Sequence, residues 1–220
     1  MELQGLTFNF LGDSITAGHS VEDIASNRYD NILKAACGLK EVRNYAIGGT
    51  RIAHQYHPSA EARWDLHFCG RAEMMDPNAD VVVVFGGTND YGHGDAPFGR
   101  MGDRDRSTYC GAVRWLMEYL VGKYPQATIV FLTPARRLDD EAPSASIHRC
   151  APGLPLQAYV DVILETAKDY PISVLDLYRQ LGIDPNCEAD RIAYTADGLH
   201  FNDEGHRKIA EMLRAFLLTL

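Results

Sequence analysis

Five short apolar runs, each rich in β-branched or aromatic residues, alternate along the chain with segments of helical periodicity. Strands that alternate with helices form βαβ units, so the pattern predicts a mostly parallel sheet with helices on both faces. The fold class that we expect is α/β, as a three-layer α/β/α sandwich with a five-stranded, mostly parallel, flavodoxin-like sheet. The expected strands are residues 6–11, 42–47, 81–85, 128–132 and 172–177. The expected helices, besides the last one, are residues 31–37, 60–75, 108–123 and 156–168.

Two of these elements have especially clear patterns. The run at residues 81–85 is apolar at every position, as in a strand buried on both faces, so we expect it in the centre of the sheet. The last helix has apolar residues at spacings of three and four, which places them on one stripe. Its members are Ile209, Met212, Leu213, Phe216, Leu217 and Leu220.

The chain has the length of one domain. Its 220 residues suffice for a single hydrophobic core, and no repeat, low-complexity tract or linker divides them. We therefore expect one domain over residues 1–220, with residues 135–155 as its loosest segment.

The composition excludes several classes of partner. A formal net charge of −9 disfavours nucleic acid, which requires a concentrated basic surface. No stretch approaches eighteen uninterrupted apolar residues, so no membrane span is expected. The start of the chain lacks the basic segment of a secretory signal. The five cysteines are an odd number without a C-x-x-C pair, which argues against a disulfide framework or zinc site and favours buried free thiols. We therefore expect a cytoplasmic protein.

The polar residues of interest follow the expected strands. In open parallel sheets, ligands bind outside the carboxyl ends of the strands, so these segments should meet at one rim. They are residues 12–18, 48–51, 86–90 and 134–137.

Three residues have the chemistry of a serine nucleophile and its activating partners. A serine hydroxyl reacts only when a base removes its proton, and that base needs a group that fixes its tautomer. Ser14 follows a strand in a glycine-flanked turn, and Asp197 lies three positions before His200, so both of those side chains can share one face of a turn. Taken singly, each residue also has an ordinary interpretation: a helix-capping serine, an aspartate that caps a turn and a surface histidine.

Acyl transfer also requires donors directed at the developing oxyanion. Gly49 and Asn89 occupy the expected ends of the second and third strands and carry suitable N–H groups. Considered separately, the pair Gly48 and Gly49 indicates a tight turn, and Asn89 a left-handed or capping position.

Together these segments resemble the SGNH/GDSL hydrolase family, whose four blocks occur here in order. The matching segments are Gly12-Asp13-Ser14-Ile15, Asn44-Tyr45-Ala46-Ile47-Gly48-Gly49, Gly86-Gly87-Thr88-Asn89-Asp90 and Asp197-Gly198-Leu199-His200. The resemblance extends from residue 6 to about residue 206. Two positions depart from the family pattern: Ile15 replaces a leucine, and Phe201 stands where proline often follows the histidine.

The resemblance implies a serine ester hydrolase and a role for each matching residue. Ser14 is the expected nucleophile and first oxyanion donor, His200 the base and Asp197 the acid that orients it. Gly49 is the expected backbone donor and Asn89 the side-chain donor. Asp13 has no part in the triad and is expected to hold the turn.

Other catalytic motifs are absent from the sequence. It has no G-x-S-x-G elbow, no P-loop, no G-x-G-x-x-G after the first strand and no H-E-x-x-H. His54 and His57 could suggest a metal-ligand pair, but acids at matching positions are lacking, so a polar loop is the better interpretation. We expect no cofactor and no metal.

The substrate class follows only from the rim loops. Residues 51–64, 91–106 and 136–149 are rich in Arg, His, Asp and Tyr and poor in bulky aliphatic residues, which favours a small or polar ester such as an O-acetylated carbohydrate. A thioesterase or lysophospholipase-type acylhydrolase of the same family is the alternative. Two non-enzymatic alternatives are a flavodoxin-like binding module, in which Ser14 and Thr16 would contact a phosphate, and a catalytically silent relative that binds sugar or acts as a scaffold.

Overall fold

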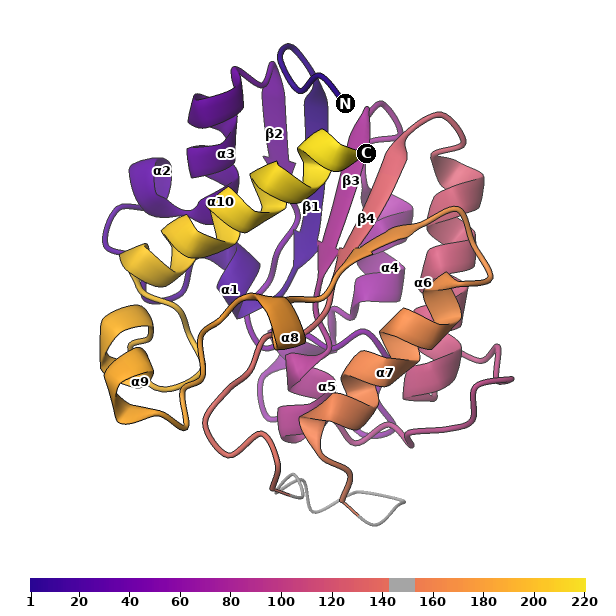
Figure 1. The fold of residues 1–220 in the computed structure, drawn as a ribbon. Helices are drawn as coiled ribbons and strands as arrows, with labels where there is room; N and C mark the ends of the chain where they lie inside the picture. The colour runs from indigo at the N-terminus through magenta and orange to yellow at the C-terminus, as the bar shows by residue number, and fades with distance from the viewer. Residues whose placement is uncertain (143–152) are drawn as a thin grey trace.

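A five-stranded sheet, with every strand pair parallel, runs through the middle of the protein (Figure 1). The computed structural model describes residues 1–142 and 153–220. In spatial order the strands are β2 (Glu41–Asn44), β1 (Thr7–Gly12), β3 (Val81–Phe85), β4 (Thr128–Leu132) and β5 (Ser173–Leu175). This order is that of flavodoxin-like sheets, and it reverses direction between β1 and β3. The expected α/β fold class is confirmed.

Helices cover both faces of the sheet and complete the three layers (Figure 1). On one face lie α3 (Tyr29–Cys37) and α10 (Asp203–Thr219), and on the other lie α4 (Phe68–Met74), α6 (Tyr109–Lys123) and α7 (Leu156–Ala167). The remaining helical turns are short: α1 (Ser14–Ala17), α2 (Ile24–Asn27), the 3₁₀ turn η1 (Ala62–Asp65), α5 (Thr88–His93), α8 (Leu177–Gln180) and α9 (Glu188–Tyr194).

Strand β3 contributes side chains to the two hydrophobic cores, one on each face of the sheet. Val81, Val83 and Phe85 pack with α3 and α10, whereas Val82 and Val84 pack with α4 and α6. Side chains of a strand alternate between the two faces, so a strand that is apolar throughout must be covered on both sides. The prediction of a central, doubly buried strand at residues 81–85 is confirmed.

Two predicted elements end differently in the structure. The strand expected at residues 42–47 ends at Asn44, because the Asn44 side chain accepts a hydrogen bond from the Ala46 N–H and turns the chain. The helix expected at residues 60–75 is two elements, η1 and α4. The break occurs because His67 starts a new helix, with its side chain accepting a hydrogen bond from the Gly70 N–H.

The remaining boundaries differ by a few residues. Strand β5 is shorter than expected because Asp176 caps α8 through the Arg179 N–H. The last helix packs its stripe as predicted except for Leu220, which lies beyond α10 and is 45% exposed. Part of the segment expected to be loosest, residues 143–152, lies outside the described residues.

Cysteine burial follows the prediction only in part. Among the described residues, Cys69 and Cys110 are buried free thiols, Cys37 is half-buried and Cys187 is exposed. No helix in the described part of the chain has the length and apolar character needed to cross a membrane.

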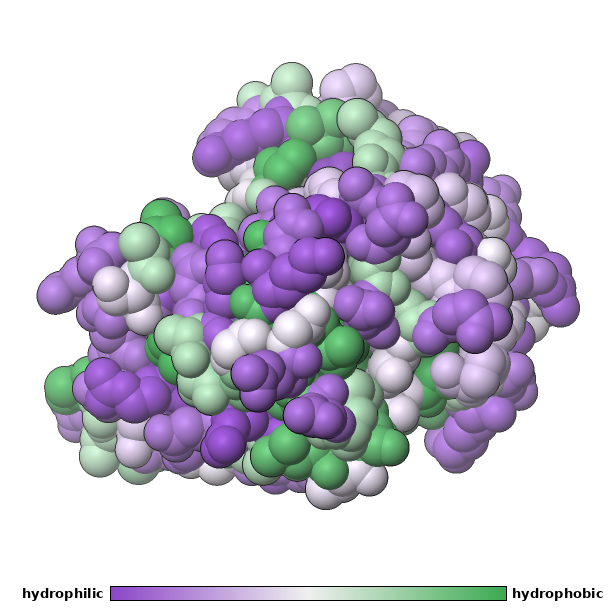
Figure 2. All heavy atoms as spheres, turned by 90° about the horizontal axis from the view of Figure 1, so that it is seen from above, coloured by the Kyte–Doolittle hydropathy of each residue, from purple (hydrophilic) through white to green (hydrophobic). Residues whose placement is uncertain are grey.

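The carboxyl ends of the strands point away from the end of the molecule where both chain termini lie (Figure 1). Helices α1 and α5 begin at those carboxyl ends, directly after β1 and β3. The opposite end, viewed in Figure 2, is a mostly hydrophilic surface with scattered apolar residues. The predicted rim is therefore at the end that carries α1 and α5.

Candidate active site

Ser14 is held at the start of α1 by the residues just before it. Asp13 caps the helix, and its carboxylate accepts a hydrogen bond of 3.0 Å from the Ile15 N–H. Burial raises the pKa of Asp13 to about 7. Position 12 has no room for a side chain, because a Cβ there would lie 2.2 Å from the Thr16 hydroxyl oxygen. Ser14 is thus the first residue of the helix, and Asp13, not Ser14, is the cap.

The serine meets the predicted histidine and aspartate across almost the whole chain. The Ser14 Oγ lies 2.9 Å from Nε2 of His200, although the two residues are 186 positions apart. The other ring nitrogen of His200, Nδ1, lies 2.7 Å from Oδ2 of Asp197. The His200 side chain is only 15% exposed. The interpretation of His200 as an ordinary surface histidine is therefore wrong.

Asp197 both caps its turn and contacts the imidazole. Its Oδ1 accepts hydrogen bonds from the N–H groups of Leu199 (2.9 Å) and His200 (2.7 Å), which leaves Oδ2 for the ring. Burial raises the pKa of this carboxyl, but the His200 side chain and the two backbone N–H groups outweigh burial and lower the pKa below its ordinary value. A carboxylate held ionised in this way can stabilise an imidazolium.

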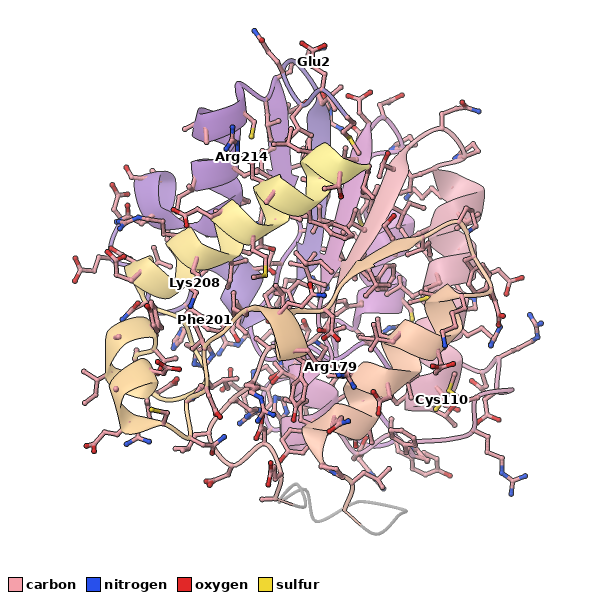
Figure 3. All side chains as sticks on the ribbon, viewed as in Figure 1. Glu2, Cys110, Arg179, Phe201, Lys208 and Arg214 are labelled. Atoms are coloured by element: carbon pink, nitrogen blue, oxygen red, sulfur yellow. The ribbon has the colours of Figure 1, made fainter. Side chains whose placement is uncertain are left out.

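The loop that carries His200 is fixed at both ends. Thr195 and Phe201 form an antiparallel bridge, and Phe201, labelled in Figure 3, is buried. Asn202 then caps α10 by accepting a hydrogen bond from the Gly205 N–H. Phe201 stands where the family pattern often has proline, and its ring packs in the core. Ile15, the other position that departs from the family pattern, is buried in the same core.

The turn that carries the predicted backbone donor Gly49 lies beside Ser14. A Cβ on Gly48 would be 3.5 Å from the Ser14 Cβ, so this glycine turn lies against the serine. Gly49 has a φ of +79°, as expected for a tight turn, and a Cβ there would be 2.1 Å from Nε1 of Trp64. Asn89 lies within α5 and donates from Nδ2 to the Thr50 carbonyl at 3.0 Å. Its interpretation as a left-handed or capping residue is wrong, because Gly87 is the cap.

Sequence reasoning missed a buried arginine that joins these segments. Arg71 donates to the Gly12 carbonyl at 3.0 Å, to the Thr50 hydroxyl at 2.7 Å and also to the Tyr45 carbonyl. It therefore ties the end of β1 to the turn that carries Gly49. Nothing in the sequence distinguishes Arg71, because its partners are mostly backbone oxygens on other elements.

A second missed residue lies against the imidazole of His200. The exposed ring of His19 lies 4.3 Å from the ring of His200, with a tilt of 59° between them. His19 follows α1 closely in the chain, so its position near Ser14 could have been found from the sequence, but its contact with His200 could not.

Thr16 cannot take the role that a flavodoxin-like module would give it. The residue is fully buried, and its hydroxyl lies 3.0 Å from the Tyr29 hydroxyl. A phosphate at the end of β1 would therefore have no access to Thr16.

A small cavity with mostly polar lining residues adjoins the predicted oxyanion donors. It has a volume of about 180 Å³, and Trp64, which packs against Gly49, forms part of its wall together with His93. The rings of these two residues lie 4.7 Å apart. The other lining residues are Arg51, Gln55, His57, Pro58, Ser59, Ala60 and Asp95.

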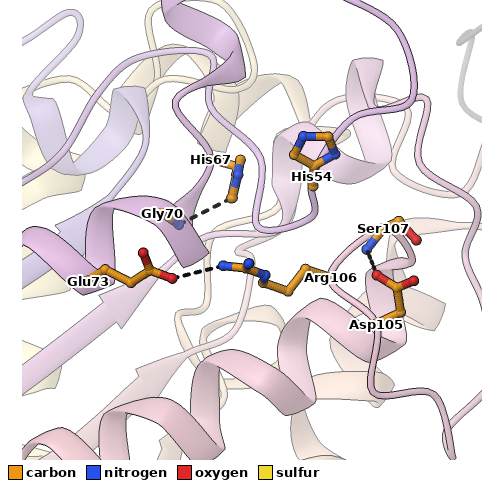
Figure 4. A pocket seen from close by; sticks show the side chains of 7 residues that line it. All are labelled: His54, His67, Gly70, Glu73, Asp105, Arg106 and Ser107. Carbon is orange, nitrogen blue, oxygen red and sulfur yellow. Dashed lines mark hydrogen bonds and ion pairs between the residues drawn. The ribbon is translucent and has the colours of Figure 1, made fainter.

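A larger cavity, shown in Figure 4, has a volume of about 410 Å³. His54 and His67 flank it, and none of its lining residues belongs to the predicted site. His57, the other histidine of the polar loop, contacts Asp95 at 3.0 Å. Within residues 1–142 and 153–220, no group of three or more His, Cys, Asp or Glu side chains is arranged to hold a metal ion.

The chain belongs to the GDSL-like lipase/acylhydrolase family, whose model matches residues 10–208. A solved structure of a protein from Lactobacillus plantarum is 31% identical, with a TM-score of 0.82 and coverage of 98% of each chain.

More distant structures share the fold. A member of the lipolytic G-D-S-L family from Veillonella parvula is 18% identical, with a TM-score of 0.63 over 97% of this chain and 99% of the other. A comparison with curated proteins found no match.

Proposed function

We propose that this protein is a serine ester hydrolase that works through an acyl-enzyme on small or polar esters. One observation carries the proposal: a chain of two hydrogen bonds connects the Ser14 hydroxyl, the His200 imidazole and the Asp197 carboxylate. Since a carboxylate can only accept hydrogen bonds, the His200 Nδ1 carries a proton and Nε2 is free to accept one from the serine.

The reaction proceeds in two steps. The Ser14 oxygen attacks the ester carbonyl while His200 takes its proton, and the tetrahedral intermediate then expels the alcohol, which receives that proton. Water, deprotonated by His200, next attacks the acyl-serine, and the acid leaves as Ser14 recovers its proton. Asp197 stabilises the imidazolium that forms in each step.

The oxyanion site consists of three donors from three segments. They are the backbone N–H groups of Ser14 and Gly49 and the Nδ2 amide of Asn89. Asn89 is buried and Gly49 is held by Trp64, so both donors are in place before charge develops. Donors fixed in this way need not reorganise during the reaction, which makes their contribution to catalysis large.

The polar cavity beside the donors supports a small or polar substrate. Its 180 Å³ is lined by arginine, glutamine, histidine, serine and aspartate side chains, together with the apolar residues Pro58, Ala60 and Trp64. A long acyl chain requires a broad apolar trough, whereas a short acyl group or a sugar hydroxyl fits polar walls. An O-acetylated carbohydrate combines both features.

The acyl-chain preference tests this substrate class. With one aryl leaving group, we expect kcat/KM for the acetyl ester to exceed that for the dodecanoyl ester by about tenfold or more, because the cavity cannot cover the longer chain. Both esters must be assayed below the concentration at which the long one aggregates. Faster cleavage of the dodecanoyl ester would overturn the small-ester proposal and support the lysophospholipase or thioesterase alternative.

The non-enzymatic alternatives have less support. A flavin-binding module would use Thr16, which is buried against Tyr29. A silent relative would have no physical need for a row of short hydrogen bonds from serine to aspartate.

A further inference from the structure

Both the nitrogen and the oxygen of the Asn89 side-chain amide are hydrogen-bonded. Its Nδ2 donates to the Thr50 carbonyl at 3.0 Å, and its Oδ1 lies 3.2 Å from Nε2 of His93. Asn89 and His93 are four positions apart on α5, a spacing that puts them on one face of the helix. His93 in turn places Nδ1 at 3.0 Å from the guanidinium Nη1 of Arg51.

The arginine determines which ring nitrogen of His93 carries the proton. A guanidinium has only donors, so the Nδ1 of His93 must be the acceptor in this contact. In a neutral imidazole the proton is then on Nε2, which donates to the Oδ1 of Asn89. The amide nitrogen of Asn89 consequently faces the opposite way, towards the Thr50 carbonyl.

Arg51 is itself fixed and almost fully withdrawn from solvent. Its guanidinium donates to the Ser59 hydroxyl and to Oδ1 of Asp65 at 3.2 Å, and its side chain is only 2% exposed. Burial, followed by the positive charges of Arg51 and Arg137, lowers the pKa of His93 to about 4. His93 is therefore neutral at neutral pH, and its tautomer follows from Arg51.

We propose that Arg51 and His93 are positioning residues that hold the Asn89 amide with its N–H groups directed at the oxyanion site. The inference rests on the proposed function, since it assigns a role within that same site. One N–H of Asn89 is used by Thr50, and the second remains for the substrate. An amide turned the other way would present its oxygen to the developing negative charge and oppose the reaction.

A double-mutant cycle tests whether His93 acts through Asn89. We expect Asn89→Ala to lower kcat by about 10²- to 10³-fold. His93→Leu should lower kcat by about tenfold, the size expected for coupled neighbours in one hydrogen-bonded network, with little change in KM. In the Asn89→Ala background, His93→Leu should change kcat by less than about twofold, because no amide remains to be oriented.

Conservative and control variants separate orientation from general disruption. His93→Gln offers an acceptor to Arg51 and a donor to Asn89 and should restore most of the lost kcat, as should Arg51→Lys compared with Arg51→Met. His54→Leu, which alters an exposed side chain on the larger cavity, should leave kcat unchanged. Thermal unfolding of every variant monitors the fold.

The outcomes distinguish this inference from the proposed function. If His93→Leu lowers kcat equally with and without Asn89, the effect is structural and the positioning role is wrong, while Ser14 keeps its assigned role. If instead Ser14→Ala leaves activity intact, the proposed function itself fails, whatever the cycle gives.

Discussion

Ser14→Ala should lower the turnover of an acetyl aryl ester by on the order of 10⁵-fold or more, because loss of the nucleophile removes the whole covalent route. The Ser14 Oγ is the atom that His200 Nε2 contacts at 2.9 Å, and its replacement by a methyl hydrogen leaves the imidazole without a proton to take. The residual rate would come from binding and the oxyanion donors alone. Steady-state hydrolysis at saturating ester measures this directly.

A matched serine variant provides the control. Ser26→Ala, on α2, removes an exposed hydroxyl that donates to the Asp23 carboxylate at 2.8 Å, and should keep wild-type turnover. An active Ser14→Ala protein with normal stability would show that the ester is hydrolysed elsewhere.

Asp197→Asn should lower kcat by about 10⁴-fold through the histidine tautomer. Two backbone N–H groups, those of Leu199 and His200, already occupy Oδ1, so an asparagine would keep its oxygen there and turn its NH₂ towards His200. The Nδ1 of His200 would then have to accept, and the ring proton would move to Nε2, where it blocks proton transfer from Ser14. The kcat of the purified variant tests the expectation.

Asp190→Asn is the appropriate control for that substitution. The Asp190 Oδ2 accepts from the Asp184 N–H at 2.9 Å, a bond that asparagine keeps, so turnover should be unchanged. An Asp197→Asn enzyme within tenfold of wild type would contradict the orienting role of Asp197.

The layers of the fold were predictable because hydrophobic patterns report burial directly. Residues 81–85 are apolar without interruption, and the structure buries them on both faces. Boundaries were less predictable, since side-chain caps decide them. The Asn44 turn ends β2 inside a segment whose pattern predicts strand, and the His67 cap starts α4 inside a segment whose pattern predicts helix.

Candidate site residues could be predicted where single residues follow strands. Ser14 and Asn89 lie just beyond β1 and β3, and Gly49 lies in the turn that follows β2; parallel strands bring their carboxyl ends together. His200 was found from its spacing to Asp197 and from the family resemblance. Each of these residues can be recognised from its near neighbours in the sequence.

The contacts of Arg51, Arg71 and His93 were not predictable. Each pairs with groups on other elements, such as Arg51 with His93 across 42 positions, and no periodicity of strand or helix encodes such a pairing. Their sequence positions gave only a polar rim loop and, for Arg71, an expected helix.

Labelling with a fluorophosphonate, followed by mass spectrometry of the peptides, most directly tests whether Ser14 is the activated nucleophile. A single phosphonyl group on Ser14, absent from Ser14→Ala and formed far more slowly in His200→Ala, is the predicted result. An adduct on a different serine, or none in a preparation that hydrolyses acetyl esters, would contradict it.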